Sequence, residues 1–122
     1  MIPDTTFLSD FWHERQGRAS GPASAFAANP RRQRLLTTVI SAGEIAVIFD
    51  TTEEARAFLS PYRILRLTPE IAYAAADVER EIGQRLGEND NWIAGFCRYY
   101  GQPVISRDAA FDRVRDLRRL AY

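Results

Sequence analysis

The 122-residue sequence contains no lysine, because all sixteen of its basic residues are arginine. A chain without lysine has no lysine nucleophile, forms no Schiff base, and lacks the lysine that phosphate-binding loops use. Its single cysteine, Cys97, rules out an internal disulfide and fits a reducing compartment such as the cytoplasm. Acidic residues also number sixteen, so the formal net charge is zero, which excludes a strongly basic nucleic-acid binder of the histone kind.

Long apolar runs are also absent. No stretch approaches the roughly 18 apolar residues that a membrane span needs, so we expect no membrane association. The first ten residues, MIPDTTFLSD, carry two acids and no basic residue, unlike a signal peptide. The hydrophobic fraction of 46% is nevertheless enough for a packed core, and the length fits a single domain over residues 1–122.

Segments typical of strands alternate with segments typical of helices. After a short apolar stretch at residues 1–4, β-branched or apolar segments predict strands at 35–41, 63–67 and 103–106, with an edge strand in 117–122. Apolar spacing and capping residues predict helices at 9–15, 23–28, 42–50, 51–62, 68–87, 90–101 and 107–116. This alternation predicts a three-layer α/β/α domain with a mostly parallel central sheet, in which ligands bind beyond the carboxyl ends of the strands.

Acidic residues lie at the ends of these segments. Asp4, Glu44 and Asp108 each follow a strand-like stretch, and Asp90 opens the helix before the strand at 103–106. Such junctions gather at one edge of a parallel sheet, where four carboxylates would repel one another unless a cation lay between them. Because the ligands would be oxygen atoms alone, without Cys or His, Mg²⁺ or Mn²⁺ suits the site better than zinc.

Each of these carboxylates also has a structural explanation, which the residues alone leave open. The stretch from Ser41 to Glu44 fits a capping box, in which Glu44 would bond back to the N-cap amide. Asp108 fits a helix cap, and either Asn89 or Asp90 fits the N-cap of the helix that follows them. Capping is the more common role for any one of them, whereas four acids at one sheet edge make a shared metal site an equal alternative.

Four stretches of the chain match the acidic motifs of a known family in order and separation: PDTTFLSD, ISAGEIA, GENDNWIAG and ISRDAAF. Through them the chain resembles PIN domains, and in particular the VapC-type toxin ribonucleases of toxin–antitoxin systems. The resemblance covers nearly the whole chain, and GENDNWIAG and SRDAAF are its most specific matches. The chain departs from the family pattern at Thr6, where the family has Asn, and at Pro3, which falls within a strand expected to be central.

The resemblance implies a metal-dependent endoribonuclease that hydrolyses RNA phosphodiester bonds. It implies that one or two Mg²⁺ or Mn²⁺ ions are held by Asp4, Glu44, Asp90 and Asp108. It also implies a prokaryotic, cytoplasmic toxin that forms a homodimer and binds a VapB-type antitoxin protein. A catalytically lapsed PIN-like domain that acts as a binding module is the alternative. A receiver domain would need a lysine, which the chain lacks, and a haloacid-dehalogenase-like phosphatase would need a second Asp two positions after Asp4, where the chain has Thr6.

Further candidates surround the four acids. Thr6 and Ser106 are hydroxyls that would bond a carboxylate, a metal-bound water or a phosphate, although backbone bonding at a turn is an equally simple role. Asp112, one turn after Asp108, would be an accessory ligand or else a solvated helix acid. A basic group would contact RNA phosphates, or else lie solvated at the surface: Arg31, Arg32, Arg34 and Arg107.

Overall fold

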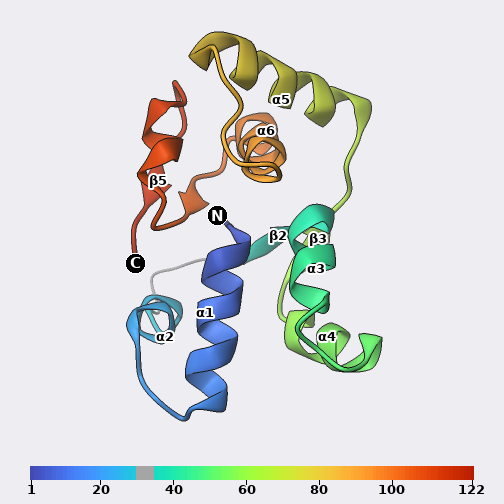
Figure 1. Ribbon diagram of the computed structural model, residues 1–122, viewed down its shortest axis with the longest axis vertical. Helices are drawn as coiled ribbons and strands as arrows, with labels where there is room; N and C mark the ends of the chain where they lie inside the picture. Colours follow the sequence, from blue (N-terminus) through green and yellow to red (C-terminus); the bar gives the residue numbers. More distant parts are fainter. Residues whose placement is uncertain (30–34) are drawn as a thin grey trace.

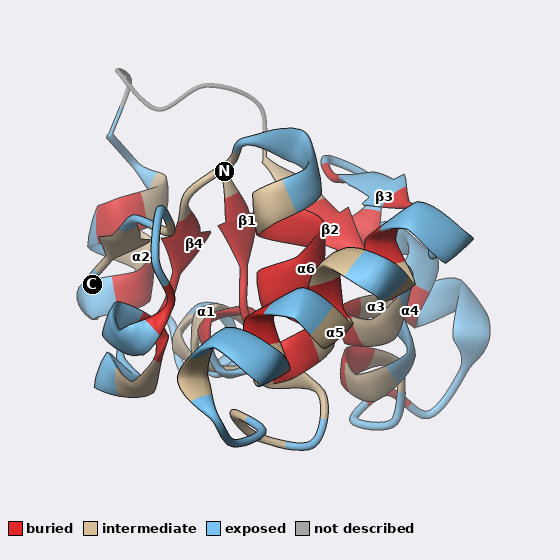
Figure 2. Cartoon of the chain, turned by 90° about the horizontal axis from the view of Figure 1, so that it is seen from above, coloured by how far each residue is buried: buried red, intermediate tan, exposed pale blue. Residues whose placement is uncertain are grey.

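The computed structural model describes residues 1–29 and 35–122, and every strand pairing within these ranges is parallel. Three strands form one sheet in the order β1-β4-β5: β1 (Ile2–Pro3), β4 (Val104–Ile105) and β5 (Arg119–Leu120). A second sheet pairs β2 (Leu36–Thr38) with β3 (Arg63–Leu65). Figure 2 shows β4, β1, β2 and β3 side by side, so the two small sheets continue one another.

Pro3 explains why the sheet is divided between β1 and β2. The amides on either side of it, those of Ile2 and Asp4, donate to carbonyl oxygens of the β4 segment at 2.9 and 3.0 Å. Because successive residues alternate in direction, the nitrogen of Pro3 faces β2, and proline has no N–H to donate there. The Leu36 amide still donates to the Met1 carbonyl at 3.1 Å. The proline therefore interrupts the side facing β2 and leaves the pairing with β4, and so the place of Asp4, intact.

Each face of the sheet has its own apolar core. In β4, Val104 packs with the buried side chains of α5 and α6, whereas Ile105 packs with those of α1 to α4. Figure 1 shows α5 and α6 on one side of the strands and α1 and α2 on the other. The helices are α1 (Thr5–Gln16), α2 (Pro22–Ala27), α3 (Val39–Ala46), α4 (Thr52–Leu59), α5 (Pro69–Ile82) and α6 (Asp90–Tyr100). The predicted three-layer α/β/α fold is confirmed. None of the helices described has the length and apolar character needed to span a bilayer.

The predicted strand at 35–41 is too long, and the capping box at its end is wrong. β2 ends at Thr38, whose hydroxyl accepts a hydrogen bond from the Ser41 amide at 3.0 Å and so caps α3. The cap lies three residues earlier than predicted, because Thr38 has the extended backbone that an N-cap requires, whereas Ser41 is already helical. Glu44 therefore lies beyond the first turn of α3 and is free of any capping role.

Other helical segments also differ from their predicted bounds, among them α3 (Val39–Ala46 instead of 42–50) and α4 (Thr52–Leu59 instead of 51–62). α1 begins at Thr5 instead of residue 9 because Asp4 caps it. α5 ends at Ile82, with Gly83 as its C-cap, rather than at Gly87, since Gly83 adopts a left-handed φ of 73°, which terminates a helix without steric strain. The segment after Asp108 forms a short 3₁₀ helix, η1 (Ala109–Arg113), instead of a longer α-helix.

Candidate metal centre

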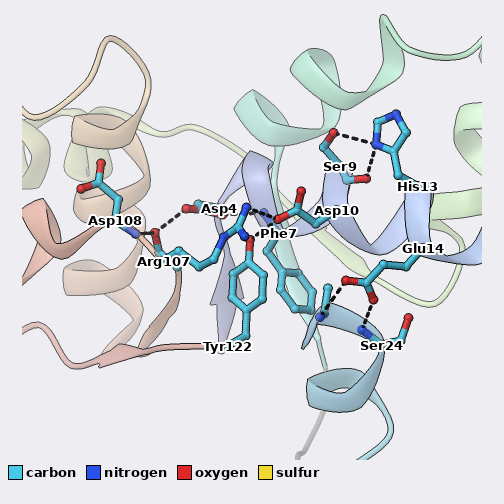
Figure 3. Close-up of polar contacts among 12 residues, drawn as sticks. Asp4, Phe7, Ser9, Asp10, His13, Glu14, Ser24, Arg107, Asp108 and Tyr122 are labelled. Atoms are coloured by element: carbon cyan, nitrogen blue, oxygen red, sulfur yellow. Dashed lines mark hydrogen bonds and ion pairs between the residues drawn. The ribbon is translucent and has the colours of Figure 1, made fainter. Parts of the chain in front are cut away.

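Parallel pairing of β1 with β4 brings Asp4 and Ser106 together, although they are 102 positions apart. The fully buried Ser106 hydroxyl donates to Asp4 Oδ2 and accepts from the Asp108 amide at 2.9 Å. Asp4 itself is only 4% exposed. Figure 3 shows Asp4 and Asp108 on either side of this connection. One serine thus links the first and last acidic motifs at the carboxyl ends of their strands.

Asp4 and Asp108 cap helices and still belong to the acidic group. Asp4 Oδ1 accepts from the Phe7 amide at 2.7 Å, and Asp108 Oδ1 accepts from the Ala110 amide at 2.8 Å. The pKa of Asp4 is raised, and burial is the largest cause. The hydrogen bonds from Ser106 and Phe7 lower this pKa, whereas the negative charge of Asp108 raises it further. Capping and ligation are compatible here, because each carboxylate oxygen has two lone pairs and a hydrogen bond uses only one of them.

Asp90 interacts electrostatically with all three of the other acids. It is half-buried at the start of α6. Its pKa is raised from 3.8 to about 6, first by burial and then by the negative charges of Asp4, Asp108 and Glu44. We name these four residues the acidic cluster. Asn89 is the N-cap residue of α6, although its side chain makes no capping hydrogen bond, and Asp90 is already the first residue of the helix.

Thr5, rather than the predicted Thr6, lies at the acidic cluster. Its hydroxyl donates to Glu44 Oε1 at 2.7 Å and so joins α1 to α3. Thr6 is exposed. The two side chains point in directions about 100° apart because they occupy successive positions of a helix. With Asp4 recognised as the cap of α1, the helical phase would have identified Thr5.

Gly87 is a functional candidate that the sequence did not reveal, because it was taken for a helix end. A Cβ atom at this position would lie 2.7 Å from Asp90 Oδ2. Real side chains essentially never approach so closely, so any residue other than glycine would displace the carboxylate. The lack of a side chain at position 87 leaves the space in which Asp90 sits.

The acidic cluster has the donor chemistry of a site for a hard divalent cation. Its donors are oxygen atoms alone, as Mg²⁺ and Mn²⁺ prefer. No ion pair in residues 1–29 and 35–122 involves one of its four carboxylates, although the charge of Asp108 contributes to the raised pKa of Arg119. In that part of the chain no three Asp, Glu, His or Cys side chains already converge on one point as metal ligands do. A bound cation would draw together carboxylates that otherwise repel one another.

The remaining candidates have other partners or lie elsewhere. Asp112 accepts two hydrogen bonds of 2.9 Å from Arg119, which lower its pKa, and this pairing speaks against its predicted role as an accessory ligand. Arg107 forms an ion pair with Asp10 at 2.6 Å. Three of the predicted RNA contacts lie outside the described residues: Arg31, Arg32 and Arg34.

A family model described as the PIN domain matches residues 1–117, a span that contains all four acids of the cluster. The chain belongs to the PIN-domain family. The resemblance carried by the four motifs is thus confirmed. No curated protein matches the sequence of this PIN domain.

Solved structures share the fold of this PIN domain at low sequence identity. VapBC2 from Rickettsia felis, bound to a DNA fragment from its promoter, has a TM-score of 0.76 at 14% identity, covering 99% of this chain and 97% of that one. A toxin–antitoxin complex from Klebsiella pneumoniae has a TM-score of 0.74 at 18% identity, with coverage of 95% and 93%. FitAcB from Neisseria gonorrhoeae has a TM-score of 0.75 at 15% identity, with coverage of 98% and 95%.

Proposed function

We propose that this PIN domain is a metal-dependent endoribonuclease and the toxin of a type II toxin–antitoxin pair. The observation that carries the proposal is the environment of Asp90, whose pKa is raised to about 6 by burial and by three other carboxylates. Such a group gains stability when it binds a divalent cation. Family membership supports the proposal, since PIN domains are generally nucleases that use divalent metal ions.

In this proposal the acidic cluster holds one or two Mg²⁺ or Mn²⁺ ions. An ion bound there would lower the pKa of water toward neutral pH and would stabilise negative charge on the phosphate and the leaving oxygen. Ser106 and Thr5 each donate a hydroxyl hydrogen bond to one carboxylate, so two of the four are oriented by the fold. Burial and the other three carboxylates raise the pKa of metal-free Asp90 to about 6, so a bound cation would favour its charged form.

Cleavage of RNA by the purified chain tests this function. We expect wild-type protein to cleave a structured RNA in Mg²⁺ or Mn²⁺ but not in EDTA. Asp90→Asn should slow cleavage by about 1000-fold, because it removes a charged group that acts on the transition state. Circular dichroism checks that the variant is folded. Glu88→Gln changes an exposed acid two positions away and should retain wild-type activity.

Two results would contradict the proposed ribonuclease activity. Wild-type protein that cleaves none of several RNAs with either metal, and that shows no Mn²⁺ binding by calorimetry, would contradict the proposed activity. Metal-independent binding of RNA without cleavage would favour the lapsed PIN-like binding module instead.

A VapB-type antitoxin is the proposed protein partner, and an apolar groove offers a surface for it. The groove, of about 470 Å³, lies between α3, α4 and β3, and its lining includes Val39, Ala46 and Ile64. Val39 and Ile64 are large apolar residues exposed at the surface. Such an exposed apolar surface is typical of a protein interface. The fold is shared with the Klebsiella pneumoniae toxin–antitoxin complex, which supports a partner of this kind.

A charge in this groove is expected to weaken antitoxin binding. Ile64→Asp should raise the Kd at least about tenfold, because the aspartate would be desolvated against apolar side chains. The fold should survive, since Ile64 is 46% exposed. The partner to use is the product of a short reading frame next to the gene, titrated by calorimetry. Val47→Asp, 82% exposed and outside the groove lining, is the matched control. Equal affinities for both variants would place the interface elsewhere.

The expected homodimer stays a prediction, which light scattering can check.

A further inference from the structure

An RNA phosphodiester is negatively charged, and so is the acidic cluster that it would approach. A fixed positive group beside the cluster would therefore favour substrate binding. Arg107 stands next to Asp108 in the loop after β4, and the preceding residue, Ser106, is the one that connects Asp4 to Asp108. The backbone thus places Arg107 at the edge of the acidic cluster.

The guanidinium of Arg107 is held from two sides. Its Nη2 donates to Asp10 Oδ2 at 2.6 Å, and its Cζ lies 5.2 Å from the ring centre of Tyr122, a cation–π contact. The Tyr122 hydroxyl donates to the same Asp10 oxygen at 2.8 Å. Figure 3 shows Arg107 reaching Asp10 across the tyrosine ring. We call these three residues the arginine bracket.

The arginine bracket adjoins the acidic cluster and is itself anchored. The negative charge of Asp10 helps to raise the pKa of Asp4, although burial is the larger cause and hydrogen bonds lower this pKa. Burial is likewise the main cause of the raised pKa of Tyr122, to which the charge of Asp4 also contributes. The Tyr122 ring packs edge-on against buried Phe7, with centroids 4.9 Å apart. The tyrosine ring against which the guanidinium packs is therefore anchored by the core, near Asp4.

Arg119 also lies near the acidic cluster, but three of its five N–H donors already have a partner. Two of its nitrogens bind Asp112 and a third donates to the Ser106 carbonyl at 3.3 Å, and the side chain is 19% exposed. Arg107 is 54% exposed, and its bond to Asp10 uses one of the five N–H donors of a guanidinium. An exposed ion pair of this kind contributes little to stability. Arg107 can therefore take a phosphate as a second partner.

We propose that Arg107 binds the RNA phosphodiester beside the acidic cluster, and that Asp10 and Tyr122 are positioning residues that hold its guanidinium there. The inference rests on the proposed nuclease function and adds to it the group that recognises the substrate backbone. A planar guanidinium suits this task because two of its N–H groups can bond two phosphate oxygens at once.

Arg107→Gln is expected to raise KM about tenfold and to leave kcat within about twofold, because the lost contact acts on binding. RNA affinity is then measured by anisotropy of a fluorescein-labelled RNA at several NaCl concentrations, in the Asp90→Asn background so that the strand stays intact. The slope of log Kd against log salt should fall by about one, as for the loss of one phosphate contact. Arg107→Lys should restore the slope and only part of KM. Asp10→Asn should raise KM about threefold.

A matched control separates this role from a general effect of charge. Arg80→Gln removes an exposed arginine that also has one aspartate partner, Asp77, on α5, and should change neither KM nor the salt slope. Mn²⁺ affinity, measured by calorimetry, should stay within about twofold in Arg107→Gln.

Three results would overturn the proposal. An unchanged KM and salt slope in Arg107→Gln, with active wild-type protein, would refute the phosphate contact and leave the nuclease function standing. A loss confined to kcat and Mn²⁺ affinity would show that Arg107 acts through the acidic cluster instead. Wild-type protein that cleaves no RNA would overturn the nuclease function and this inference with it.

Discussion

Asparagine at position 90 is expected to stabilise the metal-free protein at pH 7 and to abolish its stabilisation by Mn²⁺. Burial and three neighbouring carboxylates raise the pKa of Asp90 to about 6, above its ordinary value of 3.8. The folded state thus holds this proton more tightly than the unfolded chain does. The contribution of Asp90 to stability is therefore complete below about pH 4 and is lost as the pH rises through about 6. At pH 7 the charged carboxylate opposes folding.

The size of the effect follows from the exposure of the carboxylate. For a fully buried group this rise in pKa would correspond to about 3 kcal/mol. Asp90 is half-buried, so solvent screening leaves about 1 kcal/mol. Its place in the first turn of α6 favours the charged form by about 0.5 kcal/mol through the helix dipole, which is the smaller effect. Metal-free Asp90→Asn should therefore melt about 2 °C above wild type.

Thermal unfolding at pH 7, followed by circular dichroism, checks both halves of the prediction. In EDTA the variant should be the more stable protein. With Mn²⁺ at about one hundred times Kd, wild type should gain about 2.7 kcal/mol, or about 10 °C, and the variant almost nothing. At pH 4 the difference between the metal-free proteins should nearly vanish.

Glu88→Gln is again the control and should behave as wild type under each condition, since Glu88 is exposed. A melting temperature of metal-free Asp90→Asn below that of wild type would mean that the Asp90 carboxylate stabilises α6 and does not destabilise the metal-free fold. An unchanged wild-type melting temperature in Mn²⁺ would argue against a metal site in the acidic cluster.

Alanine at position 95 is expected to destabilise the protein by about 2 kcal/mol, whereas alanine at position 43 should stabilise it by about 0.7 kcal/mol. Both glycines lie inside helices, where alanine is normally the better residue. A Cβ on Gly95 would lie 2.7 Å from the Ala75 Cβ and 2.9 Å from the Ile71 carbonyl oxygen, so α5 and α6 would have to separate. Around Gly43 the described residues leave open space.

The same helix contact supports the acidic cluster. The Asn91 side-chain amide, next to Asp90, donates to the Ala75 carbonyl at 2.9 Å within this buried interface. Separation of α5 from α6 would strain that bond and shift the start of α6. We therefore expect Gly95→Ala to lose Mn²⁺ affinity as well as stability, while Gly43→Ala loses neither.

Urea unfolding and calorimetric Mn²⁺ titration measure the two quantities. Ala75→Gly should be less destabilising in Gly95→Ala than in wild type, because it removes one of the clashing atoms. Equal stabilities for Gly95→Ala and Gly43→Ala would show that the helices can separate without cost, contrary to this account.

Local patterns sufficed to predict most of the helices. α5 begins as expected, with Thr68 as N-cap and Pro69 at the first helical position, because capping and proline act within one turn. The same patterns did not fix helix ends. Gly83 and Gly87 are both plausible stops in the sequence, and only Gly83 has the left-handed backbone. Thr38 and Ser41 are both plausible caps, and pairing of β2 with β3 carries the extended backbone as far as Thr38.

The sequence by itself determined the alternation of strands and helices, the order of the four acidic motifs and the likeness to PIN domains, because these are properties of short stretches and their spacing. Tertiary structure alone decided which neighbours complete the candidate site. Thr5 meets Glu44 because α1 packs against α3, and Gly87 makes room for Asp90 through the path of a loop. Arg107 meets Asp10 from 97 positions away. Contacts of this kind depend on how distant segments pack, and no local pattern encodes them.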